Sequence, residues 1–302
     1  MVAEFYIIPD SFTENRTSSK EEIENKTKKL AIDFAYIRQY KDTNRLFIHS
    51  AIYNTIFING KTIYDLLYDN DIDNDVLDRD VRLSLMKIIV ETENTSYTIE
   101  EVKEVLLPLH NESICHGLIG FNNVKDVNPN FQVVYDLKGW LDFRRYYLKL
   151  YPKNGSFFIE ECIKYFPNLH FHDRNKETVQ HLLYNCSHKI VHHLAALNDK
   201  FKQCQEQGLN RSQVLTKFSI FAELDETASL EGDARRKPNF TFDFDYNGRT
   251  IPICCEPHLK LCYNDNYPGD SSYSKDRRIY FHEGIPTIFD GKILIGHIGN
   301  HL

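Results

Sequence analysis

The sequence predicts a mixed α/β protein of the α+β type, in which an α-rich N-terminal region precedes a mixed sheet with flanking helices. Three observations lead to this prediction. Short β-type runs alternate with helical periodicity in the first third, the middle is strongly helical, and the C-terminal part is rich in strand and turn signals. With 42% hydrophobic and 26% charged residues, the 302-residue chain has a globular composition and room for one large domain or two ordinary ones.

Alternating strands and helices are expected along the first third. A strand is expected at residues 1–9, a helix at 20–39, strands at 46–48 and 56–58, and a helix at 62–68. An acidic, Asn-rich surface loop at 69–75 leads to helices at 76–92 and 99–109. Thr98 and Glu101 fit a capping box at the start of the second of these helices. This third of the chain shows no group of residues that indicates chemistry.

The middle of the chain is expected to be helical at residues 137–151 and again from Asn175 to about Gln207, with Gly208 as the stop. The second helix has apolar residues at steps of three and four, which is typical of one buried face: Val179, Leu183, Cys186, Ile190, Leu194, Leu197, Phe201 and Cys204. His181, His188 and His192 fall on the opposite side. Because no carboxylate or cysteine lies one turn away, a solvated helix side is favoured over a metal site.

The change from long helical periodicity to a new capped helix near Gly208 suggests a domain boundary there. Asn210 and Gln213 fit a capping box ahead of a helix at 214–224. The sequence therefore predicts a recognition or regulatory region over residues 1–208 and a nuclease-like domain over residues 209–302.

The strongest pattern in the chain is a β-hairpin over residues 239–261. Residues 240–246 alternate strictly between apolar and polar, and Asn247-Gly248 is the dipeptide that a two-residue type I′ turn favours most. This turn pairs Tyr246 with Arg249, and the register puts three Phe side chains on a buried face. The other face is expected to gather polar residues from both strands: Asp243, Asp245, Cys254, Glu256, His258 and Lys260.

That polar face is the candidate site. Asp243, Asp245 and Glu256 offer the oxygen ligands that Mg²⁺ or Mn²⁺ prefers, and such an ion can polarise a phosphodiester and activate water. Glu256, His258 and Lys260 are the candidate catalytic residues. Lys260 would stabilise the developing negative charge or orient the water. A polar outer face of a surface hairpin, with no function, is the alternative interpretation.

Glu256-Pro257-His258-Leu259-Lys260, together with Pro238-Asn239, resembles the motif of the PD-(D/E)xK, or restriction-endonuclease-like, nuclease superfamily. In this sequence the lysine stands four residues beyond the glutamate, and asparagine follows the proline. The resemblance covers roughly the last 90 residues and implies a core of one helix, a three-stranded meander, a second helix and a further strand. Residues 213–224 would form the first helix, 239–261 the paired strands and 292–297 the later strand.

The charge distribution limits the partners that the chain can bind. Its net charge of −7 argues against a general nucleic-acid-binding protein, so a nucleic-acid partner requires a local basic patch. Two clusters flank the hairpin, Arg235-Arg236-Lys237 and Lys275-Asp276-Arg277-Arg278, and either could contact nucleic acid or lie on a solvated surface. No apolar run has the length of a membrane helix, and seven scattered cysteines favour free thiols in a reducing cytoplasm.

The function expected from these observations is a metal-dependent nuclease or phosphodiesterase that cleaves DNA or RNA. By analogy alone, a nuclease core joined to an unrelated region suggests a prokaryotic (antiviral) defence or mobile-element system, with a possible protein partner for the N-terminal region. The alternatives are a non-catalytic module that binds nucleic acid or protein through a degenerate nuclease-like domain, and a purely structural interaction protein.

Overall fold

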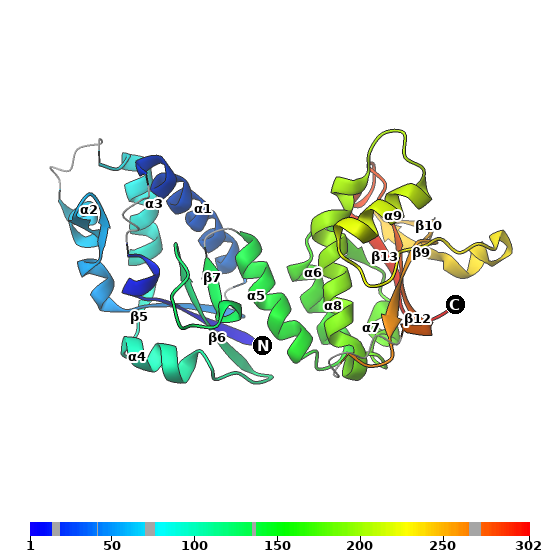
Figure 1. Cartoon of the computed structure of the whole chain (residues 1–302), viewed down its shortest axis with the longest axis horizontal. Helices are drawn as coiled ribbons and strands as arrows, with labels where there is room; N and C mark the ends of the chain where they lie inside the picture. The colour runs from blue at the N-terminus through cyan, green and yellow to red at the C-terminus, as the bar shows by residue number, and fades with distance from the viewer. Residues whose placement is uncertain (14–18, 41, 70–75, 135–136, 266–272) are drawn as a thin grey trace. The chain divides into compact units, whose positions relative to one another are not determined.

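The computed structural model describes residues 1–13, 19–40, 42–69, 76–134, 137–265 and 273–302, and it confirms a mixed α/β fold with several sheets (Figure 1). The chain divides into two compact units, unit 1 over Met1–Tyr147 and unit 2 over Leu148–Leu302. The predicted boundary near Gly208 falls inside unit 2. Of the predicted loop at 69–75, all but Asp69 lies outside the described residues.

Unit 1 contains a parallel five-stranded sheet. Its strands are β1 (Val2–Ile7), β2 (Asn44–Ile48), β5 (Glu93–Asn94), β6 (Ile114–Gly120) and β7 (Gln132–Val134). They lie in the order β5-β2-β1-β6-β7, and each neighbouring pair is parallel. The order reverses between β1 and β6, as it does at the switch point between the two halves of a doubly wound α/β fold. A short antiparallel pair, β3 (Ile56–Ile58) with β4 (Lys61–Thr62), forms a separate small sheet.

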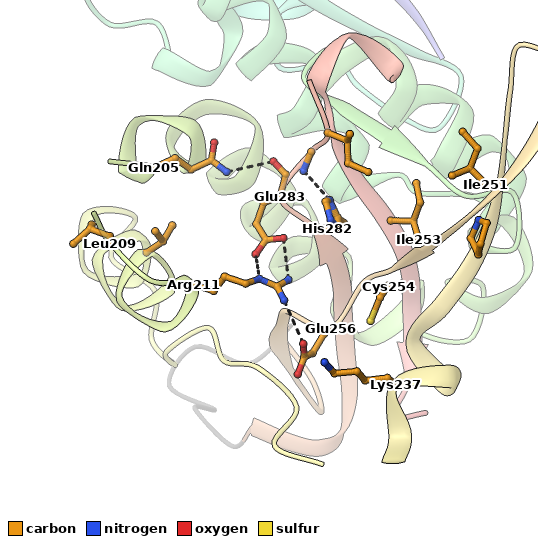
Figure 2. A pocket seen from close by; sticks show the side chains of 14 residues that line it. Gln205, Leu209, Arg211, Lys237, Ile251, Ile253, Cys254, Glu256, His282 and Glu283 are labelled. Atoms are coloured by element: carbon orange, nitrogen blue, oxygen red, sulfur yellow. Dashed lines mark hydrogen bonds and ion pairs between the residues drawn. The ribbon is translucent and has the colours of Figure 1, made fainter. Parts of the chain in front are cut away.

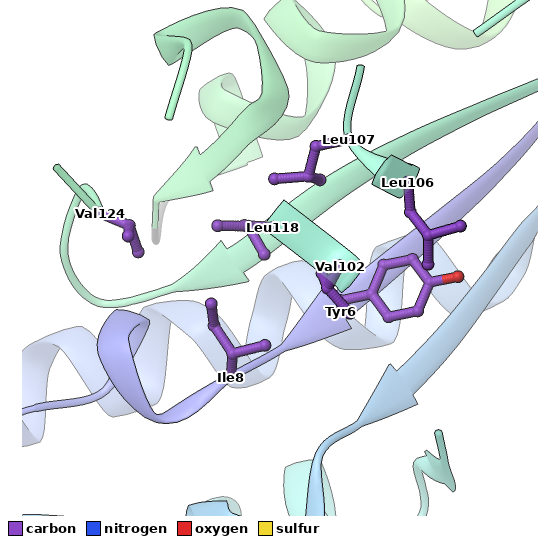
Figure 3. Close-up of a cluster of buried hydrophobic side chains, with 7 residues drawn as sticks. All are labelled: Tyr6, Ile8, Val102, Leu106, Leu107, Leu118 and Val124. Atoms are coloured by element: carbon purple, nitrogen blue, oxygen red, sulfur yellow. The ribbon is translucent and has the colours of Figure 1, made fainter. Parts of the chain in front are cut away.

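Both faces of the unit 1 sheet are covered, as parallel sheets require. On one face, Tyr6 and Leu118 pack against Val102 and Leu106 of the π-helical turn η3 (Val102–Leu106), in the cluster of Figure 3. On the other face, the ring of Phe5 lies 4.9 Å from that of Phe143 in the helix over residues 137–150, centroid to centroid. The helices are α1 (Lys20–Gln39), α2 (Ile63–Tyr68), α3 (Arg79–Val90), α4 (Ile99–Glu101) and α5 (Leu137–Leu150). The predicted helices at 20–39, 62–68 and 137–151 are confirmed.

Unit 2 is built on a mixed four-stranded sheet. Its strands are β8 (Leu169–Phe171), β11 (His258–Cys262), β12 (Tyr273–His282) and β13 (Ile293–Asn300). The order is β11-β12-β13-β8, antiparallel except for the parallel pair β13–β8. The hairpin of β9 (Thr241–Tyr246) and β10 (Arg249–Cys254) forms a second, two-stranded sheet. Phe240, Phe242 and Phe244 pack it against Tyr280 and Leu294.

Helices α6 (Gly155–Tyr165), α7 (Asn175–Thr178), α8 (Leu183–Lys200) and α9 (Arg211–Phe221) complete unit 2. The long helix predicted from Asn175 is divided into α7, α8 and the 3-10 turn η5 (Phe201–Cys204). Asn175 does not cap it. Its buried side chain instead bonds the backbone of Ile295 and Ile298 in β13. The whole predicted apolar stripe from Val179 to Cys204 is buried, and the capping box of Asn210 with Gln213 is confirmed.

The hairpin register agrees with the prediction only as far as Cys254. Tyr246 pairs with Arg249, Asp245 with Thr250 and Asp243 with Pro252, and the turn residues Asn247 and Gly248 have positive φ. Beyond Cys254 the predicted return strand ends, and residues 258–262 form a strand of the other sheet. Pro257 lies at this break, where its lack of an N–H makes continuous strand pairing unfavourable.

None of the helices in the described parts of the chain is long and apolar enough to cross a membrane. All seven cysteines are free thiols, as the sequence predicts.

Candidate functional site

Polar side chains cover the face of β11 and β12 that lies toward the hairpin. His258 pairs with Tyr280 and Lys260 with Arg278, and directly paired residues point to the same face of a sheet. Tyr280 also stacks on Phe240, with ring centroids 5.0 Å apart, which places this face against the residues that lead into β9. The predicted catalytic residues His258 and Lys260 therefore share a face, and Arg278 joins them.

Four side chains meet at the carboxylate of Glu231, and we call these five residues the Glu231 cluster: Glu231, His258, Arg278, Tyr280 and His301. Oxygen Oε1 of Glu231 forms an ion pair with Arg278 and lies 3.1 Å from the Tyr280 hydroxyl. The same oxygen is 3.5 Å from Nδ1 of His258 and 3.8 Å from Nδ1 of His301. The Glu231 side chain is 11% exposed, so a mostly buried carboxylate organises the cluster.

Hydrogen bonds link the other members of the Glu231 cluster. The Tyr280 hydroxyl is 2.6 Å from Nδ1 of His301 and accepts a bond of 3.1 Å from Nη1 of Arg278. Arg236 extends the group toward solvent, since its Nη2 lies 3.1 Å from Nε2 of His301. Two guanidinium groups and one carboxylate thus surround the imidazole of His301, whose side chain is 24% exposed.

A backbone bridge holds Ser229 beside His258. The amide of His258 donates to the carbonyl of Ser229 at 2.9 Å, and the amide of Ser229 donates to the carbonyl of His258 at 3.2 Å. Their side chains are neighbours as a result, and Oγ of Ser229 lies 3.0 Å from Nε2 of His258. The serine is partly exposed, whereas the histidine is 3% exposed.

Burial controls the protonation of these groups. Burial, followed by the positive charge of Arg278, lowers the pKa of His258 to about 4, although Glu231 opposes the shift. The same two causes lower the pKa of His301. Burial raises the pKa of Tyr280 to about 12. At neutral pH, His258 is therefore an uncharged proton acceptor, and Tyr280 keeps its proton and remains a hydrogen-bond donor.

Glu256 lies in a neighbouring pocket of about 650 Å³, shown in Figure 2. Arg211, the first residue of α9, stands between two carboxylates there. It makes a two-pronged bond with Glu283, at 2.6 and 3.0 Å, and its Nη1 is 3.3 Å from Oε2 of Glu256. Lys237 lines the pocket too, together with Ile251 and other apolar residues. The pocket therefore has an apolar wall together with two cationic and two carboxylate side chains.

The other predicted ligands, Asp243 and Asp245, lie on β9 with exposed side chains. Asp245 accepts a hydrogen bond of 2.8 Å from Thr250 across the hairpin. The register argument that joined these aspartates to Glu256 does not extend past the break at Cys254. Within the described ranges, no group of three or more His, Cys, Asp or Glu side chains could hold a metal ion, so these residues do not fit the predicted Mg²⁺ or Mn²⁺ set.

The residues of the two predicted basic clusters do not lie together, and each makes its own contacts. Arg278 is a member of the Glu231 cluster, and Arg236 lies at its edge. Arg235 has a side chain that is 95% exposed and pairs with Asp233 at 3.7 Å. Arg277 is adjacent to Arg278 on β12 and so points to the opposite face of the sheet. It donates a hydrogen bond of 2.7 Å to the carbonyl of Tyr263. Lys260 pairs with Glu226, with Nζ and Oε2 3.0 Å apart.

Sequence reasoning missed Ser229, Glu231 and His301 as members of the site. Glu231 and Ser229 belong to a loop without strand periodicity, so no pattern connects them to β11. A signal was present for Arg278 and Tyr280, because they alternate on one strand and so share a face.

Comparisons of the chain with protein-family models, with curated proteins and with solved structures found no match.

Proposed function

We propose that the chain is a nuclease or a related phosphodiesterase, and that its reactive groups are those of the Glu231 cluster in unit 2. One observation carries this proposal. A guanidinium, two imidazoles and a phenol all lie within 3.8 Å of the same oxygen of Glu231. Groups that exchange protons and a fixed positive charge are thereby placed together, and cleavage of a phosphodiester requires both.

The roles follow from charge and exposure. Arg278 would stabilise the negative charge that develops on the phosphoryl oxygens, since a guanidinium is a cation whose planar set of donors matches phosphate. The two imidazoles of the cluster, His258 and the more exposed His301, would move the protons that this cleavage requires. Tyr280 would hold His301 in place through their bond of 2.6 Å. Arg236 and Lys237 would attract the phosphate backbone at the edge of the site.

Mg²⁺ and Mn²⁺ remain candidate cofactors from the sequence, but Asp243, Asp245 and Glu256 do not form a ligand group for them among the described residues. We therefore assign proton transfer and charge stabilisation to side chains and vary the ions in the experiment. The reaction class of the proposal is thus independent of the ion.

The test is cleavage of end-labelled single-stranded RNA, single-stranded DNA and duplex DNA by the full chain, with Mg²⁺, Mn²⁺ or EDTA. We expect Glu231→Gln and Arg278→Lys to lose about 100-fold or more of the wild-type rate, because each removes an interaction that the transition state uses. Arg249→Ala is the matched control, since Arg249 is an exposed cation of the same unit that lies outside the cluster and outside both predicted basic patches. Circular dichroism checks that each variant is folded.

A non-catalytic binding module is the second candidate, and the burial of the cluster favours it. Tyr280 is fully buried and His258 is 3% exposed, so the network could equally position a loop for binding. Wild-type protein that binds labelled nucleic acid but cleaves none of it under any ion condition supports this module. Undiminished cleavage by both cluster variants would remove the Glu231 cluster as the active site.

A further inference from the structure

Ser229, His258 and Glu231 bring together a hydroxyl, an imidazole and a carboxylate, with the imidazole in contact with both of the others. Oγ of Ser229 lies 3.0 Å from Nε2 of His258, and the other ring nitrogen, Nδ1, lies 3.5 Å from Oε1 of Glu231. A nucleophile within hydrogen-bond reach of a base, with the base oriented by a third group, is the geometry that activates a hydroxyl. The reciprocal backbone bridge between Ser229 and His258 fixes the first of these contacts.

The hydroxyl-bearing residue is more exposed than the histidine beside it, as expected when a substrate approaches the nucleophile and the base is shielded. Ser229 is partly exposed, His258 is 3% exposed, and the Glu231 side chain is 11% exposed. The serine is therefore the member of the three that has solvent contact beside a mostly shielded imidazole. Arg278 contacts Glu231 as well, so a guanidinium belongs to the same group of side chains.

The proton positions are consistent with a base at His258. A neutral imidazole has one N–H, and if Ser229 donates its hydroxyl proton to Nε2, the ring proton must be on Nδ1. That nitrogen lies 3.5 Å from Oε1 of Glu231, an ion-pair contact rather than a hydrogen bond, and the negative charge of Glu231 would stabilise the imidazolium formed when Nε2 takes the proton.

We infer that Ser229 is a nucleophile, with His258 as its base and Glu231 as a positioning residue, and that phosphodiester cleavage passes through a phosphoseryl intermediate. The substrate class in this inference rests on the proposed function, whereas the reactivity of Ser229 does not. The presence of an activated serine would also explain why a partly exposed hydroxyl is paired with a buried histidine.

Each step balances. Oγ of Ser229 attacks phosphorus, its proton passes to Nε2 of His258, the bond from phosphorus to the departing sugar oxygen breaks, and that oxygen takes the proton from the imidazolium. Water then attacks the phosphoserine and gives a proton to Nε2. The bond from phosphorus to Oγ breaks, and Oγ takes that proton back, which restores the serine.

The experiment is covalent labelling of the full chain with a fluorophosphonate, in which the serine oxygen displaces fluoride from phosphorus. We expect one adduct on the peptide that contains Ser229, located by mass spectrometry. His258→Gln should slow the labelling at least tenfold, and Ser229→Ala should abolish it. Ser212→Ala, at an exposed serine of the same unit, is the matched control and should be labelled like wild type.

Parallel measurement of nucleic-acid cleavage separates the two proposals. Labelling at Ser229 together with at least a 100-fold slower cleavage by Ser229→Ala supports both. Labelling at Ser229 in a protein that cleaves no nucleic acid supports the nucleophile and overturns the proposed function. Cleavage by wild type and by Ser229→Ala at equal rates, with no adduct on Ser229 in wild type, overturns the inference and leaves the proposed function intact. The wild-type labelling result holds even if a variant fails to fold.

Discussion

His258 is buried beside a guanidinium and a carboxylate, and these neighbours fix its charge state over a wide pH range. Its pKa is lowered from 6.5 to about 4, chiefly by burial and then by Arg278. In the unfolded chain the same side chain is protonated below about pH 6.5. Between pH 6.5 and pH 4 the unfolded state thus binds more protons at this residue than the folded state does.

The sign of the resulting pH dependence follows from linkage. The contribution of His258 to stability is complete above pH 6.5 and is lost as the pH falls through about 4. As the pH falls from 6.5 to 4, the wild-type protein should therefore lose part of its free energy of unfolding. His258→Gln lacks the titrating group, so its loss over the same range should be smaller by on the order of 1–3 kcal/mol. Urea unfolding at several pH values measures this difference. His181→Gln, at an exposed position, is the control. The expectation is contradicted if the free energy of unfolding depends on pH equally in all three proteins.

The individual site residues show what a sequence can predict at this scale. His258 and Lys260 could be placed on one face, because strand alternation is a local property. Their partners could not, since Glu231 and Glu226 reach them through a loop whose path is set by contacts distant in sequence. Glu256 was expected on the polar face of the hairpin, whereas it is buried and paired with Arg211, a contact that depends on where α9 packs.

At the scale of elements, the hairpin β9–β10 packs on β13 through a glycine. A Cβ atom at Gly296 would lie 2.8 Å from Sγ of Cys255 and closer still to the ring of Phe242. We expect Gly296→Ala to destabilise the protein by roughly 1–3 kcal/mol, because the hairpin must move away from the sheet. Chemical denaturation measures the change.

Gly232→Ala is the matched control for that substitution. No heavy atom lies within 4 Å of a Cβ built at Gly232, so the change in stability should be within about 0.5 kcal/mol. A Gly296→Ala variant as stable as Gly232→Ala would mean that the hairpin packs less closely than described.

Element predictions were best where a pattern is local. The capping box at Thr98 and the type I′ turn at Asn247-Gly248 follow from adjacent residues, and both are confirmed. The break at Pro257 and the splitting of the helix after Asn175 were missed. In each case a distant strand decides the outcome: β12 pairs with residues 258–262, and β13 binds the Asn175 side chain.

At the scale of the whole molecule, the chain has two compact units with separate cores. Unit 1 packs around its parallel sheet and unit 2 around its mixed sheet and hairpin. The sequence placed the division at Gly208 because the periodicity changes there. The pairing of β8 with β13 instead assigns residues 169–171 to unit 2, which no local pattern indicates.

Separate cores lead us to expect two unfolding transitions in calorimetry. Gly120→Ala should lower the transition of unit 1, because its Cβ would lie 2.6 Å from the backbone oxygen of Ser11. Gly296→Ala should lower only the transition of unit 2. A single transition that both variants lower equally would show that the units unfold together.

The β8–β13 pairing also matters while the chain is being made. Unit 1 strand pairs lie entirely within residues 2–134, so this unit can fold on the ribosome as soon as it emerges. In unit 2, however, Leu169 of β8 cannot pair with Ile293 of β13 until more than a hundred further residues have been synthesised. At typical rates of synthesis the wait is roughly 6–25 seconds. Until β11 has also been made, α8 lacks the strand that it packs against, and we expect nascent unit 2 to depend on chaperones more than unit 1 does.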